Sequence, residues 1–149
     1  MTHADMAAET FDKGFNCAQS VVSSYANELH IDRDMVFKLA TGFGGGLGRK
    51  QEVCGAVSGG VMVLGLLHGR DEHMGKECVD KTYSEVRDLI DAFVREHGTI
   101  CCRELLSGCS LLTDEGRKRF AEDRLVEQCQ KYIRTVCTIL DRTVQQPES

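Results

Sequence analysis

Four of the eight cysteines in this 149-residue chain occupy positions at which a sulfur atom could be reactive. They are Cys17, Cys54, Cys102 and Cys129. We expect the first three in the first turns of helices, where about half a positive charge and free N–H groups favour a thiolate. Cys54 is the most distinctive of them, because the small residues Gly55 and Ala56 follow it and would let another part of the backbone approach the sulfur.

Three kinds of role fit these sulfurs. They could exchange disulfides, they could hold a soft metal such as zinc or copper(I) or an iron–sulfur cluster, or they could pack as small hydrophobic side chains in a partner-binding helical domain. The four cysteines are separated by 37, 48 and 27 residues, so the tertiary fold would have to bring them together. The chain has no C-x-x-C pair, which is typical of zinc and iron–sulfur sites. Spacing alone therefore leaves the three alternatives open.

The other four cysteines are interpreted as packing residues, because free cysteine is among the most buried residue types. They are Cys78, Cys101, Cys109 and Cys137. A disulfide between the adjacent Cys101 and Cys102 would strain the backbone and fits poorly with a helical first turn.

A glycine-rich segment, residues 42–48, precedes Cys54 and holds five glycines in seven residues. It does not fit the G-x-G-x-x-G pattern, because Leu47 stands at the last position and no strand precedes the segment, so nucleotide binding is not indicated. One interpretation is a flexible connection. In the other, backbone N–H groups approach the sulfur site, and Arg49 or Lys50 adds positive charge near Cys54. The glycines expected at this approach are Gly44, Gly45, Gly46 and Gly55.

Apolar spacing predicts helices along nearly the whole chain, and no alternating strand of five or more residues. The predicted helical segments are 11–29, interrupted near Gly14 and restarted at an Asn16–Gln19 capping box, then 34–41, 54–68, 72–96, about 99–108, and 113–139. We therefore expect an all-α protein with one domain, residues 1–149. It would be a compact bundle of five or six helices around a central glycine-rich helix, with its core at about 5–142 and a frayed tail at 143–149.

Composition and charge exclude several classes of protein. The net charge is −5, both signs are mixed along the chain, and there is no tryptophan and no basic run, so nucleic acid binding is not expected. The first residues lack a cationic and apolar signal pattern, which predicts a cytoplasmic protein whose thiols are kept reduced. The uncharged stretch 53–67 has 15 residues, fewer than the ~20 that a membrane span needs.

Five segments resemble the C-GCAxxG-C-C family of redox-active proteins. In chain order they are Phe15-Asn16-Cys17-Ala18-Gln19, residues 41–48, Cys54-Gly55-Ala56-Val57-Ser58-Gly59, Cys102-Arg103-Glu104-Leu105-Leu106 and Cys129-Gln130-Lys131-Tyr132-Ile133. The resemblance covers about residues 9–140. It implies that Cys17, Cys54, Cys102 and Cys129 are the signature cysteines of the family, and that the protein has a redox or electron-transfer role in a prokaryote.

Together these observations predict a cytoplasmic redox-active protein that uses clustered cysteines for thiol–disulfide exchange or electron transfer. The alternatives are a metal or iron–sulfur protein with the same four cysteines as ligands, and a non-catalytic helical domain. We expect Cys54 to be the most activated thiol and Cys17 to be its partner. The expected binding partner is a redox protein, and the close-packing glycine helix is compatible with a homodimer.

Overall fold

The computed structural model describes residues 1–145 and is all-α, as predicted. Its eight α-helices are α1 (His3–Asp12), α2 (Cys17–Ala26), α3 (Arg33–Ala40), α4 (Gly55–His68), α5 (Glu77–His97), α6 (Cys102–Leu105), α7 (Asp114–Glu122) and α8 (Val126–Gln145). A single 3-10 turn, η1 (Thr41–Phe43), follows α3. No strand is present in the described residues, where Val53 and Cys101 form one isolated antiparallel bridge.

The number of helices exceeds the expected five or six, in part because the predicted segment 113–139 is divided. One break, at Gly14, was predicted: this residue, with φ of 102°, separates α1 from α2. The second is at Arg124, whose φ of 52° lies between α7 and α8. An extended helical pattern of apolar residues can thus hide a turn that a single residue with positive φ creates.

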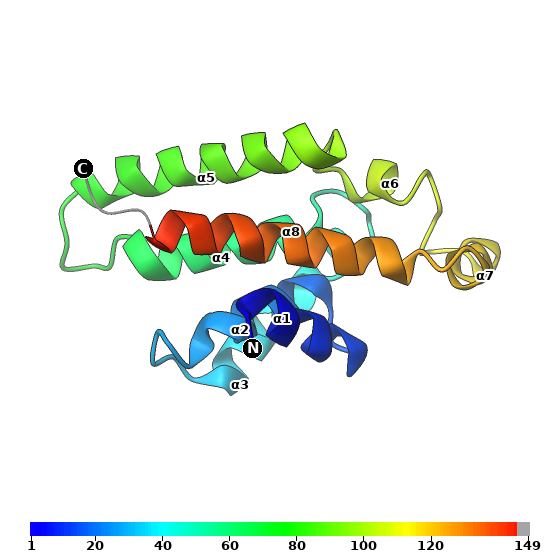
Figure 1. Cartoon of the computed structure of the whole chain (residues 1–149), viewed down its shortest axis with the longest axis horizontal. Helices are drawn as coiled ribbons and strands as arrows, with labels where there is room; N and C mark the ends of the chain where they lie inside the picture. Colours follow the sequence, from blue (N-terminus) through cyan, green and yellow to red (C-terminus); the bar gives the residue numbers. More distant parts are fainter. Residues whose placement is uncertain (146–149) are drawn as a thin grey trace.

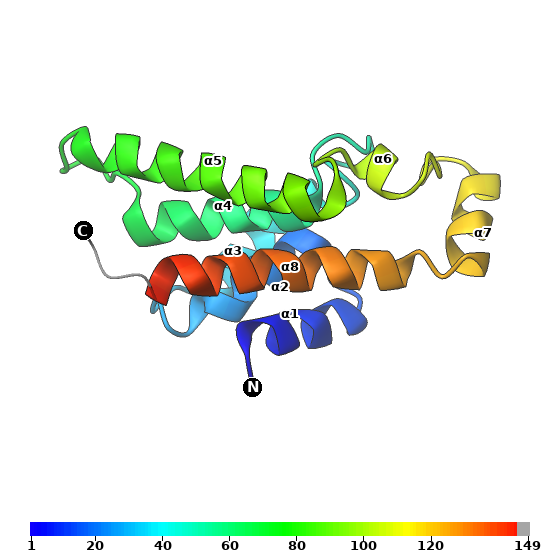
Figure 2. The same cartoon turned by 45° about the horizontal axis from the view of Figure 1, so that its top comes forward.

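The long helices α4, α5 and α8 run side by side (Figure 1, Figure 2), and each contacts the other two. The shorter helices α1, α2 and α3 pack together below them in Figure 1, with α2 against α4 and α1 against α8. At the far end of the bundle, α7 projects beyond α6 and leads the chain back into α8.

Two adjacent glycines let α4 approach its neighbours on two sides. A Cβ atom at Gly59 would lie 2.9 Å from the Val21 Cβ and 3.0 Å from the Ala18 carbonyl oxygen, both in α2. A Cβ atom at Gly60 would lie 2.7 Å from Val136 in α8. Because Cβ contacts this short are not tolerated, glycine permits the close helix crossings here.

Helix α1 is fastened to α8 by polar contacts. The His3 Nδ1 lies 2.8 Å from the Asp141 carboxylate, and the Tyr25 hydroxyl donates to the same carboxylate at 2.8 Å. In the same first turn of α1, Asp5 accepts from the Arg134 guanidinium at 2.9 Å. The beginning of the described chain is thereby joined to its last helix.

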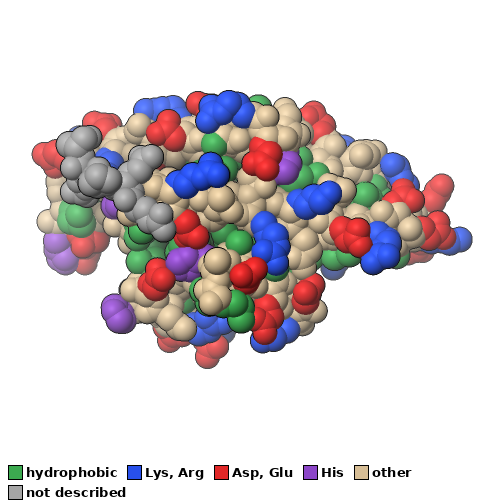
Figure 3. Space-filling view, in the orientation of Figure 1, with side chains coloured by type: hydrophobic (Ala, Val, Ile, Leu, Met, Phe, Trp, Pro, Cys, Tyr) green, Lys and Arg blue, Asp and Glu red, His purple; other side chains and the backbone are tan. Residues whose placement is uncertain are grey.

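The surface and the chain end add three observations. Acidic and basic side chains are interspersed over the face that α5 and α8 form (Figure 3), as the mixed charge pattern predicted. None of the helices in residues 1–145 is both long and apolar enough to cross a membrane. Helix α8 includes residues 143–145, which we expected in the tail, and the remainder of that predicted tail, 146–149, lies outside the described residues.

Candidate functional site

Cys17 and Cys54 stand at the beginnings of two helices that pack together. Cys17 is the first residue of α2, and the predicted capping box is confirmed: the Asn16 side chain accepts from the Gln19 N–H at 2.9 Å and the Gln19 side chain accepts from the Asn16 N–H at 3.0 Å. Cys54 occupies the N-cap position of α4. A Cβ atom at Gly55 would lie 3.2 Å from the Cys17 Cβ, so a glycine after Cys54 allows the two helix starts to meet.

Cys102 and Cys129 also stand at helix starts. Cys102 is the first residue of the four-residue helix α6. Cys129 lies in the first turn of α8, which begins at Val126. We did not predict this position for Cys129, because we expected one helical region from 113 to 139 with no break at Arg124.

Backbone hydrogen bonds hold Cys54 and Cys102 on neighbouring segments. The Cys54 N–H donates to the Ile100 carbonyl at 2.8 Å, and the Cys102 N–H donates to the Glu52 carbonyl at 2.6 Å. Between them lies the Val53–Cys101 bridge. These pairings connect the segment before α4 to the segment before α6, which are about fifty residues apart in the sequence.

The backbone of the glycine-rich segment lies against the cysteine site. Gly45 and Gly46 adopt left-handed backbone conformations with φ of 62° and 68°. A Cβ atom at Gly46 would lie 2.7 Å from the Cys102 Cβ, so the backbone approaches this sulfur site closely. Gly44 instead packs against the Asn16 side chain, 2.7 Å from its Nδ2 when a Cβ is added.

Buried Gln51 fixes the end of this segment. Its side chain is 3% exposed, and its Nε2 donates to the Cys109 carbonyl at 2.6 Å while its Oε1 accepts from the Leu111 N–H at 2.9 Å. Gln51 therefore joins the glycine-rich segment to the chain that leads from α6 to α7. Nothing in the local sequence had indicated this role.

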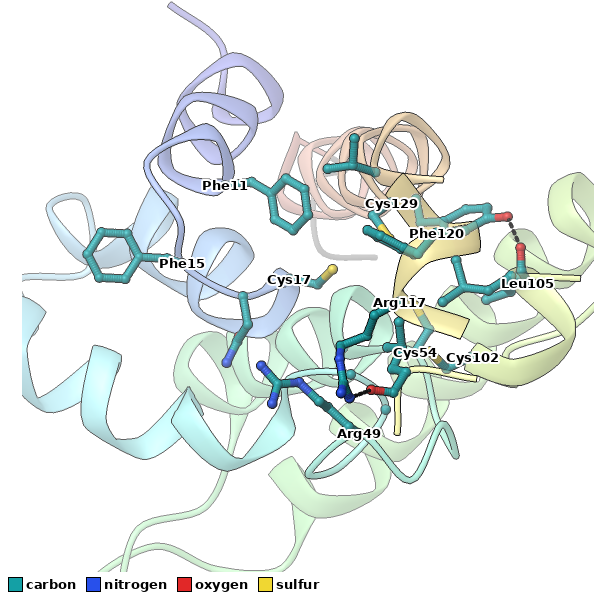
Figure 4. A pocket seen from close by; sticks show the side chains of 18 of the residues that line it. Phe11, Phe15, Cys17, Arg49, Cys54, Cys102, Leu105, Arg117, Phe120 and Cys129 are labelled. Carbon is teal, nitrogen blue, oxygen red and sulfur yellow. Dashed lines mark hydrogen bonds between the residues drawn. The ribbon is translucent and has the colours of Figure 1, made fainter. Parts of the chain in front are cut away.

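All four signature cysteines line one cavity of about 520 Å³ (Figure 4). Gly45, Gly46, Gly55 and Arg49 line the same cavity, and Lys50 does not. Cys54 and Cys102 are buried, whereas Cys17 and Cys129 are half-buried. The fold therefore assembles in one place the sulfurs that the chain carries on α2, α4, α6 and α8.

Hydrogen bonding between the Cys17 and Cys129 thiols is the largest influence on both pKa values, and it shifts them in opposite directions. The hydrogen bond lowers the pKa of Cys129 below its ordinary 9.0, although burial acts against it. The same bond, with burial and the neighbouring thiols, raises the pKa of Cys17 well above 9.0. The directions of the two pKa shifts favour Cys129 over Cys17 as the thiol that ionises.

The pKa of Cys54 does not support our expectation that Cys54 is the most activated thiol. Burial raises it to about 11, and the N–H groups of Ala56 and Val57 at the start of α4 lower it only in part. For Cys102, burial followed by the charges of Cys54 and Cys129 raises the pKa to about 12. Desolvation therefore outweighs the helix N-terminus at Cys54, and among the four cysteines only Cys129 has a lowered pKa.

The remaining cysteines lie outside the cavity lining. Cys109 and Cys137 are fully buried, and burial raises the pKa of Cys137 to about 12. Cys78 and Cys101 are half-buried. All eight cysteines are free thiols.

The cavity lining also includes Arg117 and Tyr132, which we did not propose as site residues from the sequence. Arg117 lies on α7 and reaches the cavity because α7 turns back toward the bundle. Tyr132 follows Cys129 by one turn of α8, lines the cavity, and donates its hydroxyl to the Leu105 carbonyl at 2.7 Å. The apolar pattern of α8 indicated that Tyr132 faces inward, whereas no local signal distinguished Arg117 from the other cations of α7.

The arrangement of the four cysteines bears on a possible metal role. Within residues 1–145, no group of three or more His, Cys, Asp or Glu side chains is arranged so that it could hold a metal ion. The metal or cluster role of the four cysteines stays a prediction. The cavity presents four thiol groups to a ligand.

Comparison with known proteins agrees with the signature of the cysteines. A family model described as “Putative redox-active protein (C_GCAxxG_C_C)” matches residues 15–143. Comparisons with curated proteins and with solved structures found no match.

Proposed function

Because the chain belongs to the C-GCAxxG-C-C family of redox-active proteins, we propose that it carries out thiol–disulfide exchange with the cysteines of the cavity. The cytoplasm, where such thiols are maintained in the reduced state, is the compartment we propose for it. The observation that carries the proposal is that four cysteines, Cys17 and Cys129 among them, line one cavity of about 520 Å³.

In the proposed reaction, Cys129 is the nucleophile. Its thiolate attacks one sulfur of a substrate disulfide, forms a mixed disulfide with that half, and releases the other half as a thiolate that takes up a proton. The lowered pKa of Cys129 places more of it in the reactive form at neutral pH than its neighbours.

Cys17 completes the reaction as the resolving thiol. It passes its proton to solvent or to the leaving group and attacks the Cys129 sulfur, which expels the second half of the substrate as a thiol. The products are a Cys17–Cys129 disulfide and two substrate thiols, so two electrons pass from the protein to the substrate. A reducing partner that restores the two thiols would complete a cycle.

Thiol counting tests the proposal. We expect that the reduced protein, treated with bis(2-hydroxyethyl) disulfide, loses two titratable thiols and regains them with a reductant, and that peptide mapping finds a Cys17–Cys129 disulfide. Cys129→Ser is expected to abolish the loss, and Cys17→Ser to trap a mixed disulfide on Cys129. Cys78→Ser is the matched control, because Cys78 lies outside the cavity. Equal reactivity of wild type and Cys129→Ser would refute the proposal.

The same preparation distinguishes the cluster alternative. The protein is purified without oxygen and its metal content is measured before thiol titration. A metal-free protein with reactive thiols supports exchange. A stoichiometric metal that protects the four cysteines from titration would replace exchange with electron transfer through that metal.

The pH dependence of alkylation tests the assigned roles separately. We expect iodoacetamide to modify Cys129 with a midpoint below pH 9, because the hydrogen bond from Cys17 lowers the pKa of Cys129. Cys17→Ala removes the donor and should raise that midpoint, whereas Cys17→Ser keeps a hydroxyl donor and should preserve most of the shift. An unchanged midpoint in Cys17→Ala would contradict the role of the hydrogen bond.

A further inference from the structure

The charged side chains that line the cavity are all positive. Of the described residues that line it, only Arg49 and Arg117 are charged. Both are exposed, so they lie on the solvent side of the cavity, whereas Cys54 and Cys102 are buried at its inner side. Figure 4 shows the two arginine side chains reaching into the same region from the glycine-rich segment and from α7.

Arg49 is held in place by its backbone and leaves its guanidinium available. Its φ of 64° lies in the left-handed region, which costs a residue with a side chain about 1 kcal/mol or more. A Cβ atom at Gly45 would lie 2.8 Å from the Arg49 Cγ, so the glycine makes room for the arginine stem. The Arg49 side chain forms no ion pair and no hydrogen bond within the described residues, while its backbone N–H donates to the Gly44 carbonyl at 3.2 Å. A strained, unpaired cation at a cavity is a feature that a ligand would explain.

Arg117 is oriented by contacts that use only part of its guanidinium. Its Nη1 donates to the Leu111 carbonyl at 3.1 Å and its Nη2 pairs with the carboxylate of Asp114, which is fully exposed. A guanidinium has five N–H donors, so donors remain for a second acceptor. Arginine binds carboxylates in a planar two-point geometry, and two arginines at one opening suit such a group.

The rest of the cavity lining includes several apolar side chains. Phe11 and Phe120 contribute aromatic faces, and Leu106 adds to the same lining. A ligand that fills this space would carry an anionic group at one end and a short apolar body at the other. Its reactive atom would lie next to the thiols.

We propose that the substrates of the cavity are small disulfides that carry a carboxylate, with Arg49 and Arg117 binding the carboxylate and the disulfide bond lying at Cys129. This inference rests on the proposed exchange function and specifies its substrate class. Per turnover, one disulfide and the two thiols of Cys17 and Cys129 give one protein disulfide and two carboxylate-bearing thiols.

Three disulfides of similar size and different charge test the substrate class. They are 3,3′-dithiodipropionate, which is anionic, bis(2-hydroxyethyl) disulfide, which is neutral, and cystamine, which is cationic. Release of the small thiol is measured for the reduced wild type and for Arg49→Gln, Arg117→Gln and the double variant. Each variant is compared with wild type on the same disulfide, so the different leaving groups cancel.

We expect the double variant to reduce dithiodipropionate about tenfold or more slowly than wild type, because charge-assisted hydrogen bonds to the carboxylate are lost. Its rate with the neutral disulfide should remain within about twofold, and its rate with cystamine should not fall. Lys50→Gln is the matched control, since Lys50 is the adjacent cation and lies outside the cavity lining. An equal loss on all three disulfides, or an equal loss in Lys50→Gln, would overturn the inference.

Binding without chemistry separates this inference from the proposed function. In the Cys17→Ser/Cys129→Ser variant, calorimetric titration with dithiodipropionate should show binding that Arg49→Gln weakens. If wild type reduces none of the three disulfides, the exchange function is refuted and this titration alone decides the carboxylate site. If wild type reduces the neutral disulfide and the arginine variants behave as wild type, only the carboxylate site is refuted.

Discussion

The glycines of α4 make opposite predictions for the same substitution at two positions. Alanine favours a helix over glycine by about 1 kcal/mol, so Gly→Ala should stabilise α4 wherever the added methyl has space. At Gly65 no atom lies within 4 Å of the added Cβ. At Gly59 the added Cβ would meet the Val21 Cβ at 2.9 Å and the Ala18 backbone at 3.0 Å. These atoms cannot rotate away, so α2 and α4 would have to separate.

The expected difference follows from these contacts. Gly65→Ala should raise the free energy of unfolding by up to about 1 kcal/mol. Gly59→Ala has the same helix gain but adds an overpacking cost of about 1–3 kcal/mol. The helix term cancels between the variants, which leaves a gap of about 1–3 kcal/mol, or roughly 2–12 °C in Tm for a domain of this size.

Urea unfolding followed by circular dichroism measures this gap, with wild type as reference. Gly59→Ala should also slow the reaction of Cys17, because Ala18 is the next residue in α2 and moves with the helix. The reasoning is refuted if Gly59→Ala is as stable as Gly65→Ala, since the close crossing of α2 and α4 would then not depend on the glycine.

Two other predictions concern stability. The pKa of Cys54 is raised to about 11 in the fold, so the unfolded chain loses this proton at a lower pH than the folded chain. The free energy of unfolding should therefore fall as the pH rises from about 9 to 11. Urea unfolding at several pH values checks this, and Cys54→Ala should make the free energy of unfolding depend less on pH. Gln51→Ala leaves the Cys109 carbonyl and the Leu111 N–H without their buried partner. It should lower the free energy of unfolding by about 2–4 kcal/mol, measured by thermal or urea unfolding. A decrease below about 0.5 kcal/mol would contradict the role of Gln51.

Much of the fold follows from local sequence patterns. The capping box at Asn16, the start of α4 at Cys54 and the stop at Gly69 are each signalled by a few neighbouring residues, and the structure places helix boundaries there. The small-residue pairs of α4 correctly indicated close packing, because the lack of a side chain at Gly59 and Gly60 is itself the requirement.

Other features depend on atoms distant in the sequence. The turn at Arg124 is set by a left-handed backbone at a residue with no intrinsic preference for it, so the first-turn position of Cys129 was missed. The burial of Cys54 could not be predicted in the same way: a helix N-terminus is visible in a sequence, whereas the desolvation that raises the pKa of Cys54 appears only after packing. Arg117 reaches the cavity through the path of α7, which no local pattern encodes.

The contacts between α1 and α8 have a consequence for synthesis of the chain. The pairs His3–Asp141 and Asp12–Gln130 join residues 138 and 118 positions apart. At about 5–20 residues per second, the ribosome adds Cys129 roughly 6–22 s after Cys17. During that interval α8 is not yet complete, so neither α1 nor Cys17 can contact it. Assembly of the cavity is therefore post-translational, folding should be slow for an all-α domain, and the nascent thiols depend on the reducing power of their surroundings until α8 docks.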